Sequence, residues 1–124
     1  MNASKLFDSS VWIDFLLYGN HKELVKKTEM PMLSVISLFE IEKKLLQKKL
    51  GGTPLAKSMS FIKKRSFIIP IDEATAEKAT RVSLQFGLPA IDALIYSTAV
   101  ENNAALVTMD NDFRGLPNVI LLEH

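Results

Sequence analysis

The segment from Pro89 to Ala99, with the sequence PAIDALIYSTA, constrains the fold of this chain more than any other. Pro89 suits the first position of a helix, because the backbone N–H that it lacks would have no partner there. The residues that follow are apolar on nearly every helical face, which is typical of a helix buried in a core. Asp92 lies in the first turn. It either complements the helix dipole or, since burying an unpaired carboxylate is costly, requires a cation.

Length and composition indicate one ordinary globular domain. We expect the 124 residues, 1–124, to form a single domain, and the 48% hydrophobic and 23% charged composition is usual for a soluble protein. No apolar run reaches the roughly 18 residues of a membrane span, and the N-terminus lacks a signal-peptide pattern. The absence of cysteine excludes disulfides, a thiolate nucleophile and a Cys-based zinc site, and it fits a cytoplasmic protein.

Short apolar runs alternate with helical patterns along the whole chain. We expect strands at 5–7, 31–36, 67–70, 105–108 and 119–122, and helices at 11–17, 21–27, 37–49, 55–64, 73–86 and 89–102. This alternation predicts an α/β fold, namely a three-layer α/β/α sandwich with a mainly parallel central sheet of about five strands.

The helix expected at 37–49 is rich in lysine in its second half. Lys43, Lys44, Lys48 and Lys49 suit the C-terminal end of a helix dipole, and we expect them on a solvated face. Weak attraction to phosphate is the alternative. The net charge of +1 excludes a strongly basic protein, but it does not exclude nucleic-acid binding, which depends on how charge is distributed.

Several acidic residues have local structural explanations when each is considered alone. Asp8 follows the first strand and can cap the next helix. Ser37 and Glu40 match a capping box, in which the glutamate reaches back to the serine amide. Asp110 lies in an acidic turn after a strand, which is a common arrangement. Local explanations of this kind leave the function open.

The expected topology, however, brings these carboxylates together. Parallel strands share one carboxyl edge, and ligands bind in the crevice beyond it. Several like charges in one crevice raise one another's pKa, and a divalent cation would compensate for them. Oxygen donors without His or Cys select magnesium or manganese over zinc. Such an ion activates water and neutralises charge on a leaving phosphate oxygen, so we expect hydrolysis of phosphodiester bonds.

Four segments carry a family resemblance. DSSVWI at 8–13, LSVISLFE at 33–40, IDALIYSTA at 91–99 and LVTMDNDF at 106–113 resemble the four acidic motifs of the PIN-domain nucleases, most of all those of VapC-type ribonuclease toxins. The resemblance covers essentially the whole chain. It implies a Mg²⁺- or Mn²⁺-dependent endoribonuclease that leaves 5′-phosphate and 3′-hydroxyl ends. It also implies a homodimer that is inhibited by a small antitoxin protein bound over the site.

The resemblance also assigns roles to acidic residues. Asp8, Glu40, Asp92 and Asp110 match the family's acidic quartet, and Asp112 matches a frequent fifth contributor. Asp8 and Asp92 would be the principal metal ligands. Glu40 and Asp110 would complete the pocket through waters or a second ion.

Other positions match or depart from the family pattern. Ser10 and Thr108 match small hydroxyl residues that orient carboxylates or contact phosphate. Phe39 and Tyr96 are bulkier than the residues often found beside the acidic positions, and we expect both to narrow the groove.

Two alternatives compete with a nuclease. A PIN-like domain could bind RNA or a protein without cutting. A phosphoaspartyl phosphatase or a response-regulator receiver would also place an aspartate such as Asp8 after its first strand. The phosphatase pattern, however, has a second aspartate where Ser10 stands, the receiver has an acidic pair earlier, and neither explains Glu40 and Asp92 together.

Overall fold

A computed structural model describes residues 4–123 of the chain, and its strands form one sheet. All strand pairs among these residues are parallel, and the order is β3-β2-β1-β4-β5. The strands are β1 (Ser4–Phe7), β2 (Met32–Ser34), β3 (Phe67–Ile69), β4 (Ala104–Thr108) and β5 (Val119–Leu121). The chain adds strands on one side of β1 and then returns to add the rest on the other side. The strand order therefore reverses between β1 and β4.

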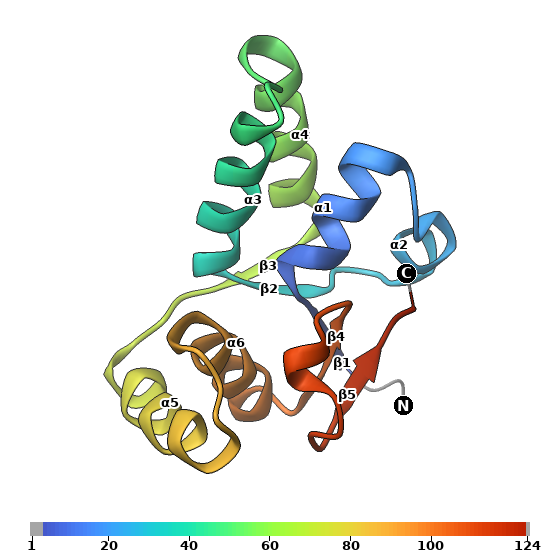
Figure 1. Ribbon diagram of the computed structural model, residues 1–124. Coiled ribbons are helices and arrows are strands. Elements are labelled where there is room, and N and C mark those ends of the chain that lie inside the picture. The colour runs from blue at the N-terminus through green and yellow to red at the C-terminus, as the bar shows by residue number, and fades with distance from the viewer. Residues whose placement is uncertain (1–3, 124) are drawn as a thin grey trace.

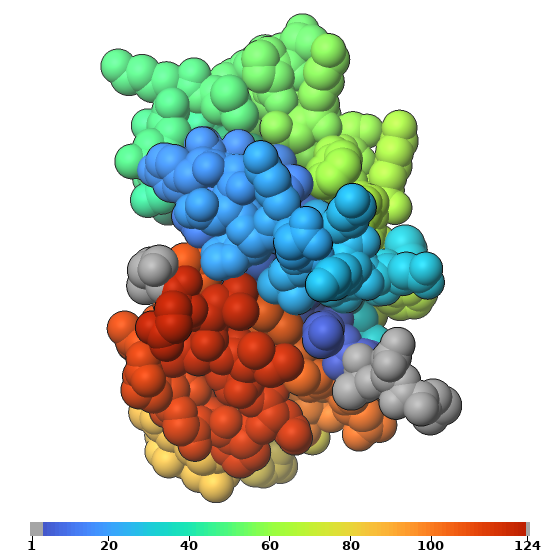
Figure 2. All heavy atoms as spheres, turned by 90° about the vertical axis from the view of Figure 1, so that its right-hand side faces the viewer, coloured from blue at the N-terminus to red at the C-terminus, as the bar shows by residue number. Residues whose placement is uncertain are grey.

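Helices cover both faces of this sheet (Figure 1). They are α1 (Ser9–Tyr18), α2 (Lys22–Lys27), α3 (Val35–Gln47), α4 (Gly52–Arg65), α5 (Glu73–Phe86) and α6 (Ala90–Glu101), with a 3-10 helix, η1 (Asn111–Phe113), after β4. In Figure 1, α3 and α4 rise side by side from the sheet, and we call Val35–Arg65 the α3–α4 arm. Figure 2 shows α1 and α2 between this arm and the C-terminal strands.

The two faces of the sheet bury separate cores, because successive strand residues point to opposite sides. Leu6 and Leu106 pack with residues of α5 and α6. Their neighbours Phe7 and Val107 pack with residues of α1 to α4, including the fully buried Trp12. The expected three-layer α/β/α sandwich with a parallel sheet is confirmed. In the part of the chain that the structure describes, no helix is long and apolar enough to cross a membrane.

Helix α6 is buried along most of its length, as its apolar sequence predicts. Pro89 lies just before the helix as its N-cap instead of at its first position. Tyr96 is only 4% exposed, and its hydroxyl donates a 2.8 Å hydrogen bond to the carbonyl oxygen of Pro117. Its ring also stacks on Phe113. Tyr96 therefore belongs to the core, and the expectation that it narrows the groove is wrong.

The start of α3 differs from the predicted capping box. Strand β2 ends at Ser34, whose extended backbone and side-chain oxygen cap the helix by accepting from the amide of Ile36. Ser37 lies inside the helix, and its buried hydroxyl has no hydrogen-bond partner among the described residues. Glu40 does not reach back to Ser37, because its carboxylate accepts from the Ser9 hydroxyl. The apolar Val35 and Ile36 extend the strand pattern in sequence, although they already belong to the helix.

Candidate functional site

An open cleft of about 400 Å³ lies at the carboxyl edge of the sheet, and four acidic residues line it. We call it the acidic cleft, and define it by Asp8, Glu40, Asp92 and Asp110. Asp8 follows β1 and Asp110 follows β4, so the two flank the point where the strand order reverses. Such switch points are where open α/β sheets bind ligands. The structure thus brings the four predicted residues into one cleft, which residues of α1, α3 and α6 also line.

Asp8 lies at the bottom of the cleft and is only 5% exposed. Its Oδ1 atom accepts a 2.9 Å hydrogen bond from the Ser9 amide, as expected of a helix cap. Its Oδ2 atom accepts from the hydroxyls of Ser10, at 2.9 Å, and Thr108, at 2.7 Å. Burial raises the pKa of Asp8, while these hydrogen bonds oppose the rise and the charge of Asp110 adds to it. Asp8 is therefore both a cap and a member of the cleft.

The same two hydroxyls also fix the loop after β4. The Ser10 hydroxyl accepts from the amide of Met109 at 3.1 Å, and the Thr108 hydroxyl accepts from the amide of Asp110 at 3.0 Å. Each hydroxyl donates to Asp8 and accepts from this loop, so it links two segments that are distant in sequence. This network holds Asp110 in position relative to Asp8.

Glu40 reaches the cleft from the first half of α3 and is half-buried. The Ser9 hydroxyl donates a 3.1 Å hydrogen bond to its carboxylate. Burial raises the pKa of Glu40, the charges of Asp8 and Asp110 raise it further, and the hydrogen bond from Ser9 opposes both effects. Ser9 was not among the predicted site residues, because its contact with Glu40 depends on how α1 and α3 pack.

Asp92, Asp110 and Asp112 form the tightest acidic group on this edge. Each offers one carboxylate oxygen, and these oxygens all lie within 4.8 Å of one another. Partial burial raises the pKa of Asp92 to about 7, with further contributions from the charges of Asp110 and Asp8 and from contact with Asp112. Asp110 also accepts a 2.9 Å hydrogen bond from the Asp112 amide at the start of η1.

The chemistry of this trio fits a hard divalent cation. All three donors are carboxylate oxygens, which magnesium and manganese prefer, and neither histidine nor cysteine takes part. The trio includes Asp112, expected as a fifth contributor. Asp8, expected as a principal ligand, lies outside the trio as the structure describes it, and hydrogen bonds occupy both of its carboxylate oxygens.

The outer wall of the acidic cleft is formed by α3 and is basic and aromatic. Phe39, Lys43, Lys44 and Gln47 line the same cleft as the carboxylates. The lysines of this helix were expected on a general solvated face. The spacing of Phe39, Lys43 and Gln47 by four residues is the signal that puts them on one helical stripe.

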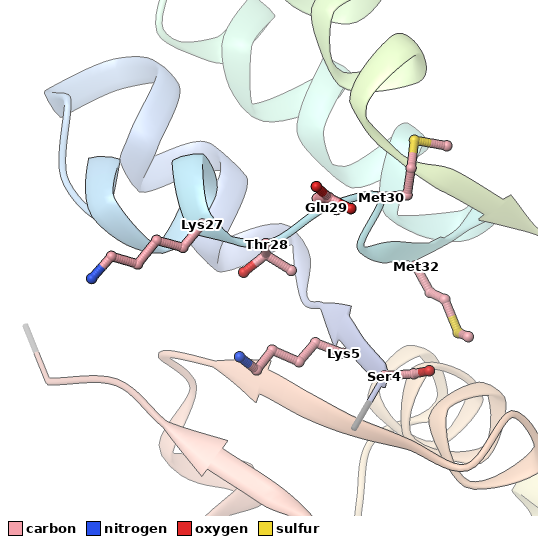
Figure 3. Close-up of a pocket in the computed structure, with 7 residues that line it drawn as sticks. All are labelled: Ser4, Lys5, Lys27, Thr28, Glu29, Met30 and Met32. Atoms are coloured by element: carbon pink, nitrogen blue, oxygen red, sulfur yellow. The ribbon is translucent and has the colours of Figure 1, made fainter. Parts of the chain in front are cut away.

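A second pocket, of about 750 Å³, lies at the opposite edge of the sheet (Figure 3). Residues at the start of β1 and in the segment leading into β2 line it: Ser4, Lys5, Lys27, Thr28, Glu29, Met30 and Met32. Glu29 is the only carboxylate among these lining residues, so the pocket lacks the acidic group on which the metal chemistry depends.

Comparisons with known proteins agree with this geometry. The sequence model of the family described as PIN domain matches residues 5–119. Among curated proteins, none matches this chain significantly. Among solved structures, a toxin-antitoxin complex from Klebsiella pneumoniae is similar, with a TM-score of 0.79 and 25% identity over 98% of this chain and 100% of that chain.

Two further structures share the fold at lower identity. VapBC2 from Rickettsia felis, bound to a DNA fragment from their promoter, has a TM-score of 0.70 and 24% identity, covering 96% of this chain and 97% of that chain. VapC20 from Mycobacterium tuberculosis, described as a Sarcin-Ricin loop cleaving toxin, has a TM-score of 0.73 and 15% identity, covering 98% of each chain.

Proposed function

Because this chain belongs to the PIN-domain family, we propose that it is a Mg²⁺- or Mn²⁺-dependent endoribonuclease and the toxin of a toxin–antitoxin pair. The observation that carries this proposal is the meeting of Asp8, Glu40, Asp92 and Asp110 in one cleft at the switch point of the sheet. The similar Klebsiella pneumoniae structure is a toxin-antitoxin complex, which supports the toxin assignment. The description of Mycobacterium tuberculosis VapC20 supports RNA as the substrate.

The metal would be held by the acidic trio. Asp92, Asp110 and Asp112 supply oxygen donors from two elements, α6 and the turn after β4. A bound divalent ion would supply activation of water at neutral pH and neutralisation of charge on the leaving oxygen. Asp8, fixed by its hydrogen bonds, would add a fourth carboxylate to the set that holds the ion.

Two kinds of residue would act on the substrate. Glu40 is half-buried with a raised pKa, so its carboxylate is a stronger base than that of an exposed glutamate and would accept a proton from attacking water. Lys43 and Lys44 line the cleft and would contact the phosphates on either side of the cleaved bond. The ends produced would be 5′-phosphate and 3′-hydroxyl.

The proposal extends to the partners and setting of the protein. Residues 1–124 would act as one domain in the cytoplasm, as a homodimer that a small cognate antitoxin inhibits. Sedimentation of the purified chain alone and with its antitoxin measures both associations. A chain that sediments only as a monomer would contradict the homodimer.

Cleavage by the Asp92→Asn variant tests the function. The change is nearly isosteric, so we expect an intact fold by circular dichroism and no cleavage of total RNA in magnesium. Wild-type protein should cleave in magnesium and stop when EDTA is added. Glu77→Gln, an exposed carboxylate on α5, is the control and should cleave normally.

Two results would contradict the proposal. Undiminished cleavage by Asp92→Asn in magnesium would refute the site. RNA binding by the wild-type protein without any turnover in magnesium would support the alternative of a non-cleaving PIN-like domain.

A further inference from the structure

Phe39 is a large apolar side chain that is exposed in the acidic cleft. Its side chain is 56% exposed, and it directly precedes Glu40 on α3. A phenylalanine contributes more buried apolar area than most residues when it is covered, so an exposed ring at a reaction site is available to a partner. Ile13 and Ile91 line the same cleft and add apolar surface near the carboxylates.

One lysine lies over this ring, and a second lines the same cleft. The Nζ atom of Lys43 lies 5.7 Å from the centre of the Phe39 ring, which is within the range of a cation–π contact. Lys43 and Gln47 continue the stripe of Phe39 along α3, and Lys44 lies beside them in the cleft. Phe39 remains 56% exposed beside this contact, so part of its ring is open to a planar ligand.

The α3–α4 arm extends this positive character beyond the cleft. It holds eight of the 15 lysines and arginines of a chain whose net charge is only +1. Against them it has two acidic residues, Glu40 and Glu42. The basic residues are Lys43, Lys44, Lys48, Lys49, Lys57, Lys63, Lys64 and Arg65. Two of these residues, Lys43 and Lys44, line the acidic cleft, so a polyanion that enters it meets positive charge on α3.

We infer that Phe39 is a base-stacking residue for single-stranded RNA, and this inference rests on the proposed function. A nucleobase beside the cleaved phosphate stacks on the Phe39 ring, while Lys43 and Lys44 neutralise the adjoining phosphates. Base–aromatic stacking requires an unpaired base, because bases inside a duplex already stack on one another. A protein partner could also cover an apolar ring. The alternation of ring and cations beside a candidate metal site favours a nucleic acid.

Binding of two oligonucleotides to inactive protein tests the inference. The parent protein carries Asp92→Asn, so that it should not cleave. The probes are a fluorescein-labelled single-stranded oligoadenylate and a ribose-phosphate strand of equal length without bases. Fluorescence anisotropy in magnesium gives both affinities. We expect the parent to bind the oligoadenylate more tightly than the abasic strand.

Adding Phe39→Leu should weaken oligoadenylate binding by about tenfold and leave abasic binding unchanged, because stacking acts on the base alone. Adding Phe39→Tyr should retain the preference, since an aromatic face remains. The matched control is Phe67→Leu, which removes a ring that is 58% exposed at the start of edge strand β3, away from the cleft. It should bind both strands as the parent does.

Equal affinities of the parent for the two strands would overturn the inference, as would unchanged binding by Phe39→Leu. Loss of antitoxin binding in Phe39→Leu without any change in RNA affinity would also overturn it and identify a protein contact.

Cleavage of total RNA by wild-type protein separates the stacking role of Phe39 from the proposed nuclease function. If cleavage occurs and Phe39→Leu binds normally, only the stacking role fails. If the base preference depends on Phe39 but no cleavage occurs, only the nuclease assignment fails.

Discussion

Thr108 donates a 2.7 Å hydrogen bond to the Oδ2 atom of Asp8, which lies 100 residues earlier in the chain. The contact follows from the pairing of β1 with β4, in which Phe7 lies opposite Val107. The next residue of each strand therefore reaches the carboxyl edge beside the other, and the amide of Asp8 donates to the carbonyl oxygen of Val107. The register of two strands thus determines where the buried carboxylate of the cleft lies.

Replacing Thr108 with valine should destabilise the protein. The change keeps the shape of the side chain but removes one partner of a buried carboxylate, which typically costs about 1–3 kcal/mol. Urea unfolding of the variant and the wild-type protein measures the loss of unfolding free energy. Thr98→Val is the control, because Thr98 is equally buried but donates only to the carbonyl oxygen of Leu94 in its own helix. An equal loss of unfolding free energy in Thr108→Val and Thr98→Val would contradict a special role for the contact with Asp8.

The pH dependence of stability should reveal the raised pKa of Asp92. This pKa is about 7 in the folded protein against an ordinary 3.8, so the folded state holds the proton more tightly than the unfolded chain. The resulting stabilisation is complete below about pH 4 and is lost as the pH rises through about 7. In EDTA, Asp92→Asn should therefore be more stable than wild type above about pH 7. Solvent screening of this half-buried group limits the gain to about 1–2 kcal/mol.

Asp72 provides a control for this pH series, because its pKa is lowered where that of Asp92 is raised. Hydrogen bonds from the amide and the hydroxyl of Thr75 lower the pKa of Asp72, the cap of α5. The contribution of Asp72 to folding stability is present above the ordinary pKa of an aspartate. It is lost as the pH falls through the lowered pKa of the folded state. Asp72→Asn should therefore be less stable than wild type near neutral pH and approach it in acid. If the unfolding free energies of wild type and Asp92→Asn differed by the same amount at every pH, the raised pKa of Asp92 would be contradicted.

Magnesium should raise the thermal stability of the wild-type protein, because an ion that binds only the folded state stabilises it. The expected gain is about 2.7 kcal/mol of unfolding free energy at a magnesium concentration about 100 times the dissociation constant. Asp110→Asn removes one member of the acidic trio and should reduce the gain, whereas Glu77→Gln should retain it. A melting temperature that does not respond to magnesium or to EDTA would argue against a metal site.

Replacing either of two serines near the start of α3 with alanine should change the unfolding free energy by different amounts. Ser34 caps the helix through its side-chain oxygen, so Ser34→Ala should cost about 0.5–2 kcal/mol of unfolding free energy. Ser37 is buried with an unpaired hydroxyl, so Ser37→Ala should cost nothing or stabilise slightly. Denaturant unfolding of both variants checks the assignment. A larger loss of unfolding free energy for Ser37→Ala than for Ser34→Ala would support the capping box predicted from sequence.

Much of the architecture could be predicted because it depends on local pattern. The apolar faces of α6 identified a buried helix, and the alternation of strands and helices predicted the parallel sheet. Parallel strands share one carboxyl edge, so the topology also predicted that Asp8 and Asp110 would meet there. These inferences need only the order of elements and the direction of the strands.

The details that sequence could not supply depend on how distant elements pack. The start of α3 was misplaced because Val35 and Ile36 suit a strand as well as a helix. The contact between Ser9 and Glu40 requires α1 and α3 to lie at one particular separation. Tyr96 was expected in the groove, although the rotation of α6 turns its ring toward Phe113 in the core.

The pairing of β1 with β4 also sets the order in which the cleft is completed during translation. Domains fold as their chains emerge from the ribosome, from the N-terminus onward. A nascent chain that has exposed Asp8, Glu40 and Asp92 still lacks β4, and with it Thr108 and Asp110. The cleft therefore stays unfinished until β4 and Asp110 have also emerged from the ribosome, however early its other carboxylates are exposed.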